Sequence, residues 1–251
     1  MSEYTLGIDL NRYRPGFDIE LAKASDVRYV ILKATEVWSG TKWEDPTFIP
    51  YLRQTKAAGL PVGAYMYWRA SEDPEEQVDW FIEIVKKKID LPPAIDVERY
   101  NNVGVLSPAD AEQSIFECAQ LLTSFYNVEP LLYTSWWSWR SLCNDGELAR
   151  DLPLWVAAWT TAQAPLKPVP AVEWEFWQFT SAYPLPGQPK TCDANRYNGS
   201  EAEFAEYVKV NRSLMYPEAP PPEPEPDPQV FLPLTMTLGG TTYDGEVVIV
   251  E

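Results

Sequence analysis

The chain has 251 residues, enough for one large α/β barrel or two ordinary domains. With 37 acidic against 20 basic residues its formal net charge is −17, which argues against nucleic acid or an anionic membrane surface as the main partner, because phosphate binding depends on Lys and Arg. The sequence contains no histidine, which excludes histidine-based metal sites and Ser-His or Cys-His catalytic dyads.

The apolar runs and capping residues predict an alternation of strands and helices. In chain order the predicted elements are a strand over 4–10, a strand over 28–34, a helix over 45–59, a strand over 61–68, a helix over 73–88, a strand over 92–98, a helix over 107–126, strands over 130–135, 153–159, 175–181 and 191–199, and a helix over 200–211. Repeated β-then-α units with near-continuous apolar strands indicate a parallel sheet covered by helices.

About eight strands in some 210 residues suit an irregular TIM-like (β/α) barrel, with helices missing from the later repeats. An open doubly wound sheet is the competing architecture. No G-x-G-x-x-G motif follows a strand, so a dinucleotide-binding role has no support.

The composition changes at Tyr216. Residues 217–229, PEAPPPEPEPDPQ, cannot pack a core and predict an extended linker. Beyond them, residues 230–251 show apolar alternation interrupted by Gly239-Gly240 and Asp244-Gly245, two hairpin signals. We therefore expect a catalytic barrel over 1–215, a Pro/Glu-rich linker over 216–229 and a short β-hairpin-like segment over 230–251.

The cysteines and the N-terminal residues bear on the compartment. Cys118, Cys143 and Cys192 are too scattered for a disulfide framework or a zinc site, so free buried thiols are expected. Residues 1–10 lack the pattern of a signal peptide, and no apolar stretch approaches the roughly 18 residues of a membrane span. The expectation is a protein made in a cytoplasm, without membrane insertion.

Two acids, Asp96 and Glu98, lie in the predicted strand over 92–98. Side chains two apart in a strand share a face, and their Cα atoms are roughly 6.5–7 Å apart. Repulsion between them should raise one pKa, and a protonated carboxyl beside an ionised one is what glycosidic bond cleavage requires. Taken alone, a D-x-E tripeptide is more often a strand end whose acids cap loops or pair with a neighbour such as Arg99.

Two further acids favour the catalytic interpretation. Asp9 ends the first predicted strand, and Asp193 is expected to end the last one. The first and last strands of a closed barrel are neighbours, so both acids should flank the mouth at which Glu98 lies.

Seven stretches of the chain resemble the glycoside hydrolase family 25 lysozymes, the Chalaropsis-type muramidases. They are GIDLNRY with the following FD (7–18), PVGAYMY (61–67), PAIDVE (93–98), LLYTS (131–135), LWVAAW (154–159), WEFWQFTS (174–181) and CDANRYNG (192–199). The resemblance covers residues 4–210 and implies hydrolysis of the β-1,4 bond between N-acetylmuramic acid and N-acetylglucosamine in peptidoglycan.

The resemblance also implies roles for individual residues. Glu98 would be the general acid/base, and Asp96 would stabilise the substrate's N-acetyl group or the developing positive charge. Asp9 and Asp193 match the family's two further active-site acids. The implied saccharide contacts are Tyr65, Tyr67, Tyr133, Trp159 and Gln178. No cofactor or metal is expected, since four carboxylates without histidine or a calcium-loop spacing make a poor metal site.

Two rival functions remain open at this point. A chitinase-like barrel also has a strand ending in D-x-E, but it typically carries another acid two residues before the aspartate, where this chain has Ala94. A non-catalytic saccharide-binding protein of a virion or cell wall is the second rival, and the presence of all four carboxylates counts against it. The stereochemical course is also open, with retention assisted by the substrate's N-acetyl group favoured.

The expected biology is that of a phage endolysin, which waits in the host cytoplasm for release through a holin, and a bacterial or eukaryotic enzyme released by another route is the alternative. The partner would be the glycan strands of bacterial peptidoglycan. Residues 230–251 would expose apolar faces and strand edges if free, so we expect them to be covered by the barrel, by a partner or by another copy, with self-association favoured.

Overall fold

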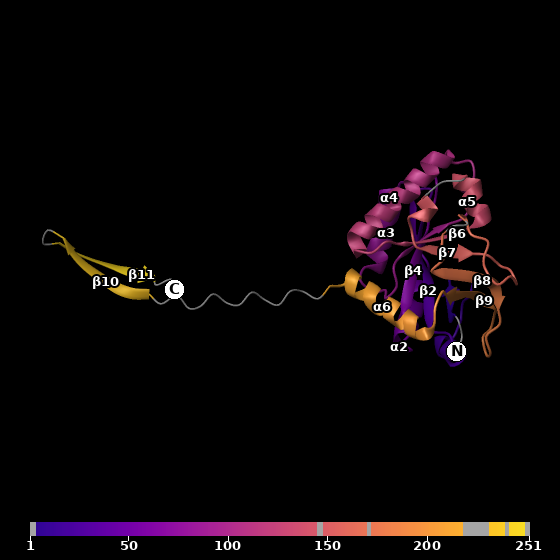
Figure 1. Ribbon diagram of the computed structural model, residues 1–251, viewed down its shortest axis with the longest axis horizontal. Coiled ribbons are helices and arrows are strands. Elements are labelled where there is room, and N and C mark those ends of the chain that lie inside the picture. The colour runs from indigo at the N-terminus through magenta and orange to yellow at the C-terminus, as the bar shows by residue number, and fades with distance from the viewer. Residues whose placement is uncertain (1–3, 145–147, 170–171, 218–230, 239–240, 249–251) are drawn as a thin grey trace. The chain divides into compact units, whose positions relative to one another are not determined.

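The computed structural model describes residues 4–144, 148–169, 172–217, 231–238 and 241–248 (Figure 1). The chain forms two compact units, Met1–Pro217 and Glu218–Glu251. The first unit is a closed barrel, as the sequence predicts, and the open doubly wound sheet is excluded.

Eight strands form the barrel. They are β1 (Thr5–Leu10), β2 (Tyr29–Trp38), β4 (Val62–Tyr67), β5 (Ala94–Val97), β6 (Leu131–Ser135), β7 (Leu154–Ala157), β8 (Phe176–Tyr183) and β9 (Cys192–Tyr197). Their order is β1-β9-β8-β7-β6-β5-β4-β2, and a parallel pairing of β1 with β2 closes the circle. A short strand that the sequence did not indicate, β3 (Thr41–Glu44), pairs antiparallel with the end of β2.

The last barrel strand runs against its neighbours, which corrects the expectation of a parallel sheet. β9 pairs antiparallel with both β8 and β1. Residues 184–191 join β8 to β9, and so short a connection cannot make a parallel crossover, which needs a dozen or more residues.

The helices cover only part of the barrel, because the described residues that connect β7, β8 and β9 contain none. The helices are α1 (Ile19–Ala24), α2 (Phe48–Ala57), α3 (Pro74–Val85), α4 (Pro108–Tyr126), α5 (Trp136–Cys143) and α6 (Glu201–Met215), with a 3-10 turn over Leu148–Arg150. α3, α4 and α6 begin where their capping residues predict, since Asp73, Ser107 and Ser200 each accept a hydrogen bond from a backbone N–H of the first turn. The short α1 and α5 were not predicted.

Aromatic side chains fill the inside of the barrel below the site. Tyr29, Tyr65, Tyr133, Trp155 and Phe176 form one buried cluster there, and α6 adds Phe204 to it. A Cβ atom on Gly7 would lie 2.2 Å from the Tyr29 ring, so this position of β1 requires glycine.

A second apolar layer separates the strands from the helices. Ile95 and Val97 of β5 are fully buried in it. The cysteines Cys118, Cys143 and Cys192 are free and buried, as expected.

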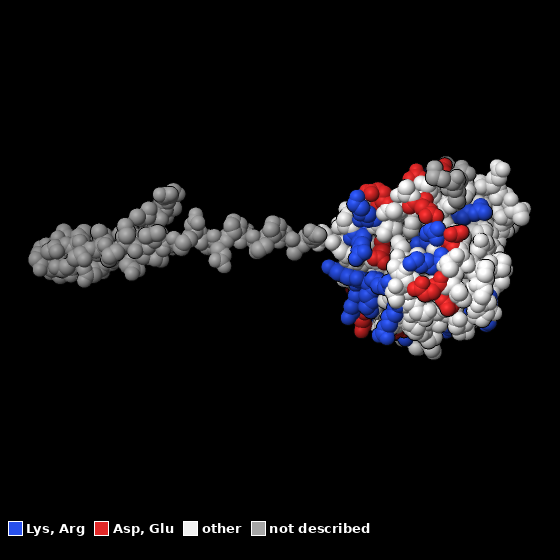
Figure 2. Space-filling view, turned by 90° about the horizontal axis from the view of Figure 1, so that it is seen from below, with Lys and Arg blue, Asp and Glu red and all other residues white. Residues whose placement is uncertain are grey.

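Charge is mixed on the part of the surface drawn in Figure 2, where basic side chains gather towards one edge with acidic ones among them. No helix among the described residues is both long and apolar enough to cross a membrane.

The second unit contains one antiparallel hairpin, β10 (Phe231–Leu238) with β11 (Thr241–Val248), in which Leu238 is opposite Thr241. Asp244-Gly245, interpreted above as a hairpin signal, instead lies inside β11, opposite Thr235 and Leu234. The other signal, Gly239-Gly240, and the linker residues 218–229 lie outside the described part of the chain.

Candidate active site

A cavity of about 190 Å³ lies at the mouth of the barrel. It is lined by Asp9, Asn11, Tyr65, Asp96, Glu98, Tyr133, Trp155, Trp159, Gln178 and Asp193. All four predicted acids are therefore brought together, with four of the five predicted saccharide contacts. Asn11 and Trp155 are additions that the sequence did not single out.

β5 explains why an apolar strand carries two acids. Its alternation buries Ile95 and Val97 against the helices, so Asp96 points into the barrel. Asp96 is 5% exposed, and Glu98, one residue beyond the strand, lies higher on the same side and is partly exposed. The pair therefore places one carboxyl on the floor and one on the rim of the cavity.

Asp9 and Asp193 face each other across the β1–β9 pair as direct register partners. The sequence interpretation placed Asp193 at the end of its strand, which is wrong: it is the second residue of β9. Because β9 is antiparallel, its start meets the end of β1, so the two acids still share the mouth.

Amide side chains hold Asp9 in place. Its Oδ2 accepts hydrogen bonds from Gln178 Nε2 at 2.9 Å and from Asn195 Nδ2 at 2.8 Å. Gln178 Oε1 in turn accepts from the Tyr133 hydroxyl at 3.1 Å and from Trp159 Nε1 at 3.0 Å. These donors fix which end of the Gln178 amide faces Asp9.

Asn195 is fixed in the same way, by a 2.8 Å hydrogen bond from Trp155 Nε1 to its Oδ1. It is fully buried, and sequence reasoning missed it. Its place two residues after Asp193 in a strand was the available signal, since such residues share a face.

Burial dominates the electrostatics of the four acids. It raises the pKa of Asp9 to about 6, against the hydrogen bonds from Asn195 and Gln178. Burial and then the charge of Asp9 raise the pKa of Asp193 to about 8. Burial also raises the pKa of Asp96 well above its usual value, followed by repulsion from Glu98.

The pKa of Glu98 is raised as well, chiefly by burial, while the charges of Lys33 and Arg69 act to lower it. The site therefore holds four carboxyls with elevated proton affinity and cannot have all of them ionised at once near neutral pH.

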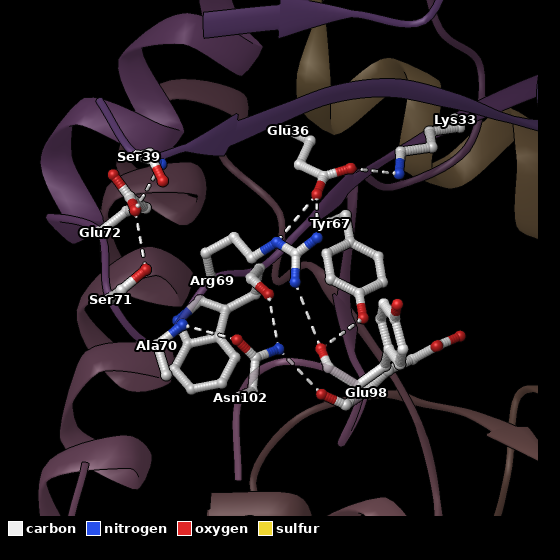
Figure 3. Close-up of polar contacts among 12 residues, drawn as sticks. Lys33, Glu36, Ser39, Tyr67, Arg69, Ala70, Ser71, Glu72, Glu98 and Asn102 are labelled. Atoms are coloured by element: carbon white, nitrogen blue, oxygen red, sulfur yellow. Dashed lines mark hydrogen bonds and ion pairs between the residues drawn. The ribbon is translucent and has the colours of Figure 1, made fainter. Parts of the chain in front are cut away.

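A buried cationic cluster borders the acids (Figure 3). Glu36 of β2 accepts hydrogen bonds from Lys33 Nζ at 2.7 Å and from the Arg69 guanidinium, whose Nε lies 2.8 Å away. Lys33 and Arg69 lie 4.7 Å and 4.5 Å from the centre of the Tyr67 ring. Sequence reasoning missed the three charged residues of this cluster.

Tyr67 is the one predicted saccharide contact that lies outside the cavity lining. It is buried between the two cations, and its hydroxyl donates to the Tyr100 carbonyl at 3.2 Å.

Asn102 connects the segment after β5 to the segment after β4 (Figure 3). Its Nδ2 donates to the carbonyls of Glu98 at 2.9 Å and Trp68 at 3.1 Å, and its Oδ1 accepts from the Ala70 N–H at 3.0 Å. Only 1% of Asn102 is exposed. The backbones of Glu98 and of the residues flanking Arg69 are therefore held by one side chain.

No group of three or more acidic or cysteine side chains is placed to hold a metal ion within the described parts of the chain.

An irregular (β/α) barrel with paired carboxyls at the end of one strand has the arrangement that glycoside hydrolases use. The family model described as "Glycosyl hydrolases family 25" matches residues 8–188, and the chain belongs to this family. The match includes Asp9, Asp96 and Glu98, and Asp193 lies just beyond it.

Individual relatives agree. The chain is 27% identical over 209 residues to Lysozyme M1 of Streptomyces globisporus, covering 79% of this chain and 69% of that one. It is 25% identical over 216 residues to the N,O-diacetylmuramidase of Arthroderma benhamiae, covering 81% and 86%. The crystal structure of a lysozyme from Streptomyces coelicolor superposes with a TM-score of 0.75 at 23% identity, covering 84% of this chain and all of that one, which supports the fold.

Proposed function

We propose that this enzyme hydrolyses the β-1,4 bond between N-acetylmuramic acid and N-acetylglucosamine in bacterial peptidoglycan. The observation that carries the proposal is the pair Asp96 and Glu98, which enter one cavity from the end of β5 opposite Asp9 and Asp193. Relatives named as lysozymes and a muramidase make peptidoglycan the substrate to test first.

Glu98 is assigned the role of general acid/base. Its raised pKa favours the protonated carboxyl, and its partly exposed position on the rim lets it reach the oxygen of the bond to be broken. The Glu98 proton passes to that oxygen as the bond to the anomeric carbon breaks, so the leaving sugar departs as a neutral alcohol.

Asp96 is assigned to the substrate's N-acetyl group. Asp96 lines the cavity, and its buried Oδ1 accepts no hydrogen bond from any described residue, so this carboxyl has an unused acceptor. An amide N–H would satisfy it and orient the acetyl oxygen to attack the anomeric carbon. Water then attacks that carbon, Glu98 takes the water's proton, and the N-acetyl group is restored with net retention of configuration.

The remaining site residues support these two acids. Asp9 and Asp193 tune the charge of the cavity, and the saccharide is held by Tyr65, Tyr133, Trp159 and Gln178. Tyr67 acts from behind them, by setting the positions of Lys33 and Arg69.

Membership of family 25 favours this function over a chitinase-like one, and Ala94 lies in the barrel core, where that class would carry a further acid. A purely binding role is disfavoured by the positions of the four acids, which supply both a proton donor and an anion. The cell wall is then the place of action.

The decisive experiment has two parts. Mass spectrometry of fragments released from purified peptidoglycan should find N-acetylmuramic acid at the new reducing ends. Glu98→Gln keeps the shape and removes the proton donor, so kcat should fall at least about 10²-fold. Glu83→Gln, an exposed change on α3, serves as the matched control. Release of N-acetylglucosamine ends, or near-normal wall clearing by Glu98→Gln, would contradict the proposal.

A further inference from the structure

A second cavity of about 590 Å³ adjoins the first. The two share Glu98, Tyr133 and Trp159. The remaining lining is Ser135, Trp136, Trp137, Ser138, Ala157, Ala158, Thr160, Ala162, Ala164 and Leu166. We call this cavity the Trp137 groove. It lies between the start of α5 and the segment that follows β7.

The walls of the groove present large apolar surfaces to solvent. Trp137 is 64% exposed, Trp159 63% and Leu166 56%. Trp136 packs edge-to-face against Trp137, with ring centroids 4.5 Å apart, and the Arg140 guanidinium lies 5.4 Å from the Trp136 ring. Exposed indoles gathered around one hollow are unusual unless they bind something.

The chemistry of the lining restricts the ligand. Glu98 is the only charged residue among the thirteen that line the groove, and the others are aromatic, aliphatic or hydroxyl-bearing. A cavity of this size and composition suits an uncharged ligand with flat apolar faces and a few hydroxyl groups. The stem peptides of peptidoglycan carry carboxylates, and the groove offers no cation to them among its described lining residues.

Glu98 fixes the direction in which the groove extends. The cavity with Asp9, Asp96 and Asp193 holds the sugar whose anomeric carbon reacts, because Asp96 must reach its N-acetyl group. A general acid lies beside the oxygen it protonates, and therefore between the reacting sugar and the leaving sugar. Since Glu98 lines both cavities, the groove is on the leaving side.

We propose that the Trp137 groove binds the leaving N-acetylglucosamine, stacking its ring on an exposed indole and placing its acetyl methyl among Ala162, Ala164 and Leu166. This inference rests on the proposed function and deepens it. Binding energy gained there would align the leaving oxygen with Glu98 and would be expressed in the rate of bond cleavage.

The test compares two substrates that share the reacting disaccharide. One is a peptidoglycan tetrasaccharide, whose leaving group is a sugar. The other is the corresponding disaccharide fluoride, whose leaving group is a fluoride ion that occupies none of the groove. The ratio of kcat/KM for tetrasaccharide to that for fluoride isolates binding on the leaving side.

Trp137→Ala should lower this ratio on the order of tenfold, and Leu166→Ala should lower it less. Phe116→Ala, an exposed aromatic truncation on α4, should leave the ratio unchanged, and circular dichroism verifies that each variant is folded. An equal loss on both substrates, or no loss on either, would overturn the inference. If the unaltered enzyme cleaves neither substrate, the proposed function fails instead, so the two failures are distinguishable.

Discussion

At the scale of a single residue, the buried carboxyl of Asp193 lowers the free energy of unfolding as the pH rises. Burial raises the pKa of its carboxyl to about 8, well above the value of about 3.8 for a free aspartate. Between these values the folded chain retains a proton that the unfolded chain releases. The free energy of unfolding therefore decreases as the pH rises through this window, and the contribution of Asp193 is most favourable at acid pH.

Asp193→Asn should accordingly raise the melting temperature more at pH 9 than at pH 4, because asparagine has no proton to lose. Thermal unfolding measured across this range gives the result directly. Asp79→Asn, on an exposed position of α3, provides the comparison. A gain of the same size at both pH values would show that Asp193 is not held in its neutral form.

Replacing each of the four acids by its amide should lower kcat to a different extent. Asp96→Asn should nearly abolish turnover, because the reacting sugar loses its charged partner on the cavity floor. Asp9→Asn and Asp193→Asn should cost less, since they act through the geometry and proton affinity of the others. Values of kcat for the three variants establish the order. If the Asp9→Asn enzyme had a lower kcat than the Glu98→Gln enzyme, the roles assigned to these two acids would be wrong.

At the scale of the element, the ends of β4 and β5 are joined through Asn102. Asn102→Ala removes three hydrogen bonds to the backbones of Trp68, Ala70 and Glu98. We expect kcat to fall about 10-fold or more, because a general acid displaced by a fraction of an ångström loses its alignment.

The pH–rate profile separates positioning from plain stability. The charge of Arg69 lowers the pKa of Glu98, so displacing Glu98 relative to Arg69 should shift the alkaline limb of the pH–rate profile. A loss of stability alone should leave this limb unchanged. Asn101→Gly is the neighbouring control, since Asn101 has a φ of 58°, which glycine adopts freely. An Asn102→Ala enzyme with unaltered kcat and an unaltered profile would limit Asn102 to a structural role.

The sequence predicted the barrel well because its strands are continuous apolar runs with clear caps between them. All eight barrel strands and the helices α2, α3, α4 and α6 lie where the pattern placed them. It missed α1, α5 and β3, which are too short to show a period. The sequence also did not indicate the direction of β9, because the apolar pattern of a strand is the same whether it pairs parallel or antiparallel with its neighbours.

Only those site residues could be predicted whose pattern is visible within one strand. D-x-E and its flanking acids have a recognisable pattern, and the cavity contains them. Arg69 and Asn102 follow β4 and β5, and their roles come from hydrogen bonds to Glu36 of β2 and to the Glu98 carbonyl, which no single predicted element indicates. Such residues resemble ordinary surface polar residues until the barrel closes.

At the scale of the whole molecule, a net charge of −17 gives the enzyme no long-range attraction to an anionic wall polymer. Basic and acidic side chains are mixed on the face drawn in Figure 2. Recognition must therefore arise at short range, in the carboxyl-lined cavity and the Trp137 groove. Aromatic stacking and buried hydrogen bonds suit that task, because salt screens them little.

The second unit contains a single described hairpin, and two strands alone are marginally stable in water. Its sequence alternates apolar residues, and both of its edges carry backbone groups that can pair with another strand. We propose that residues 230–251 associate with the same segment of another copy, because identical strand edges pair readily.

Light scattering on the full chain and on a chain ending at Met215 tests this proposal. The full chain should have a multiple of its 28.6 kDa mass, and the shortened one should be monomeric. The barrel and its activity should be unaffected, since they belong to the other compact unit. Two monomers of formula mass would refute self-association and make contact with the barrel or with another partner the better explanation, because the hairpin still needs a covering surface.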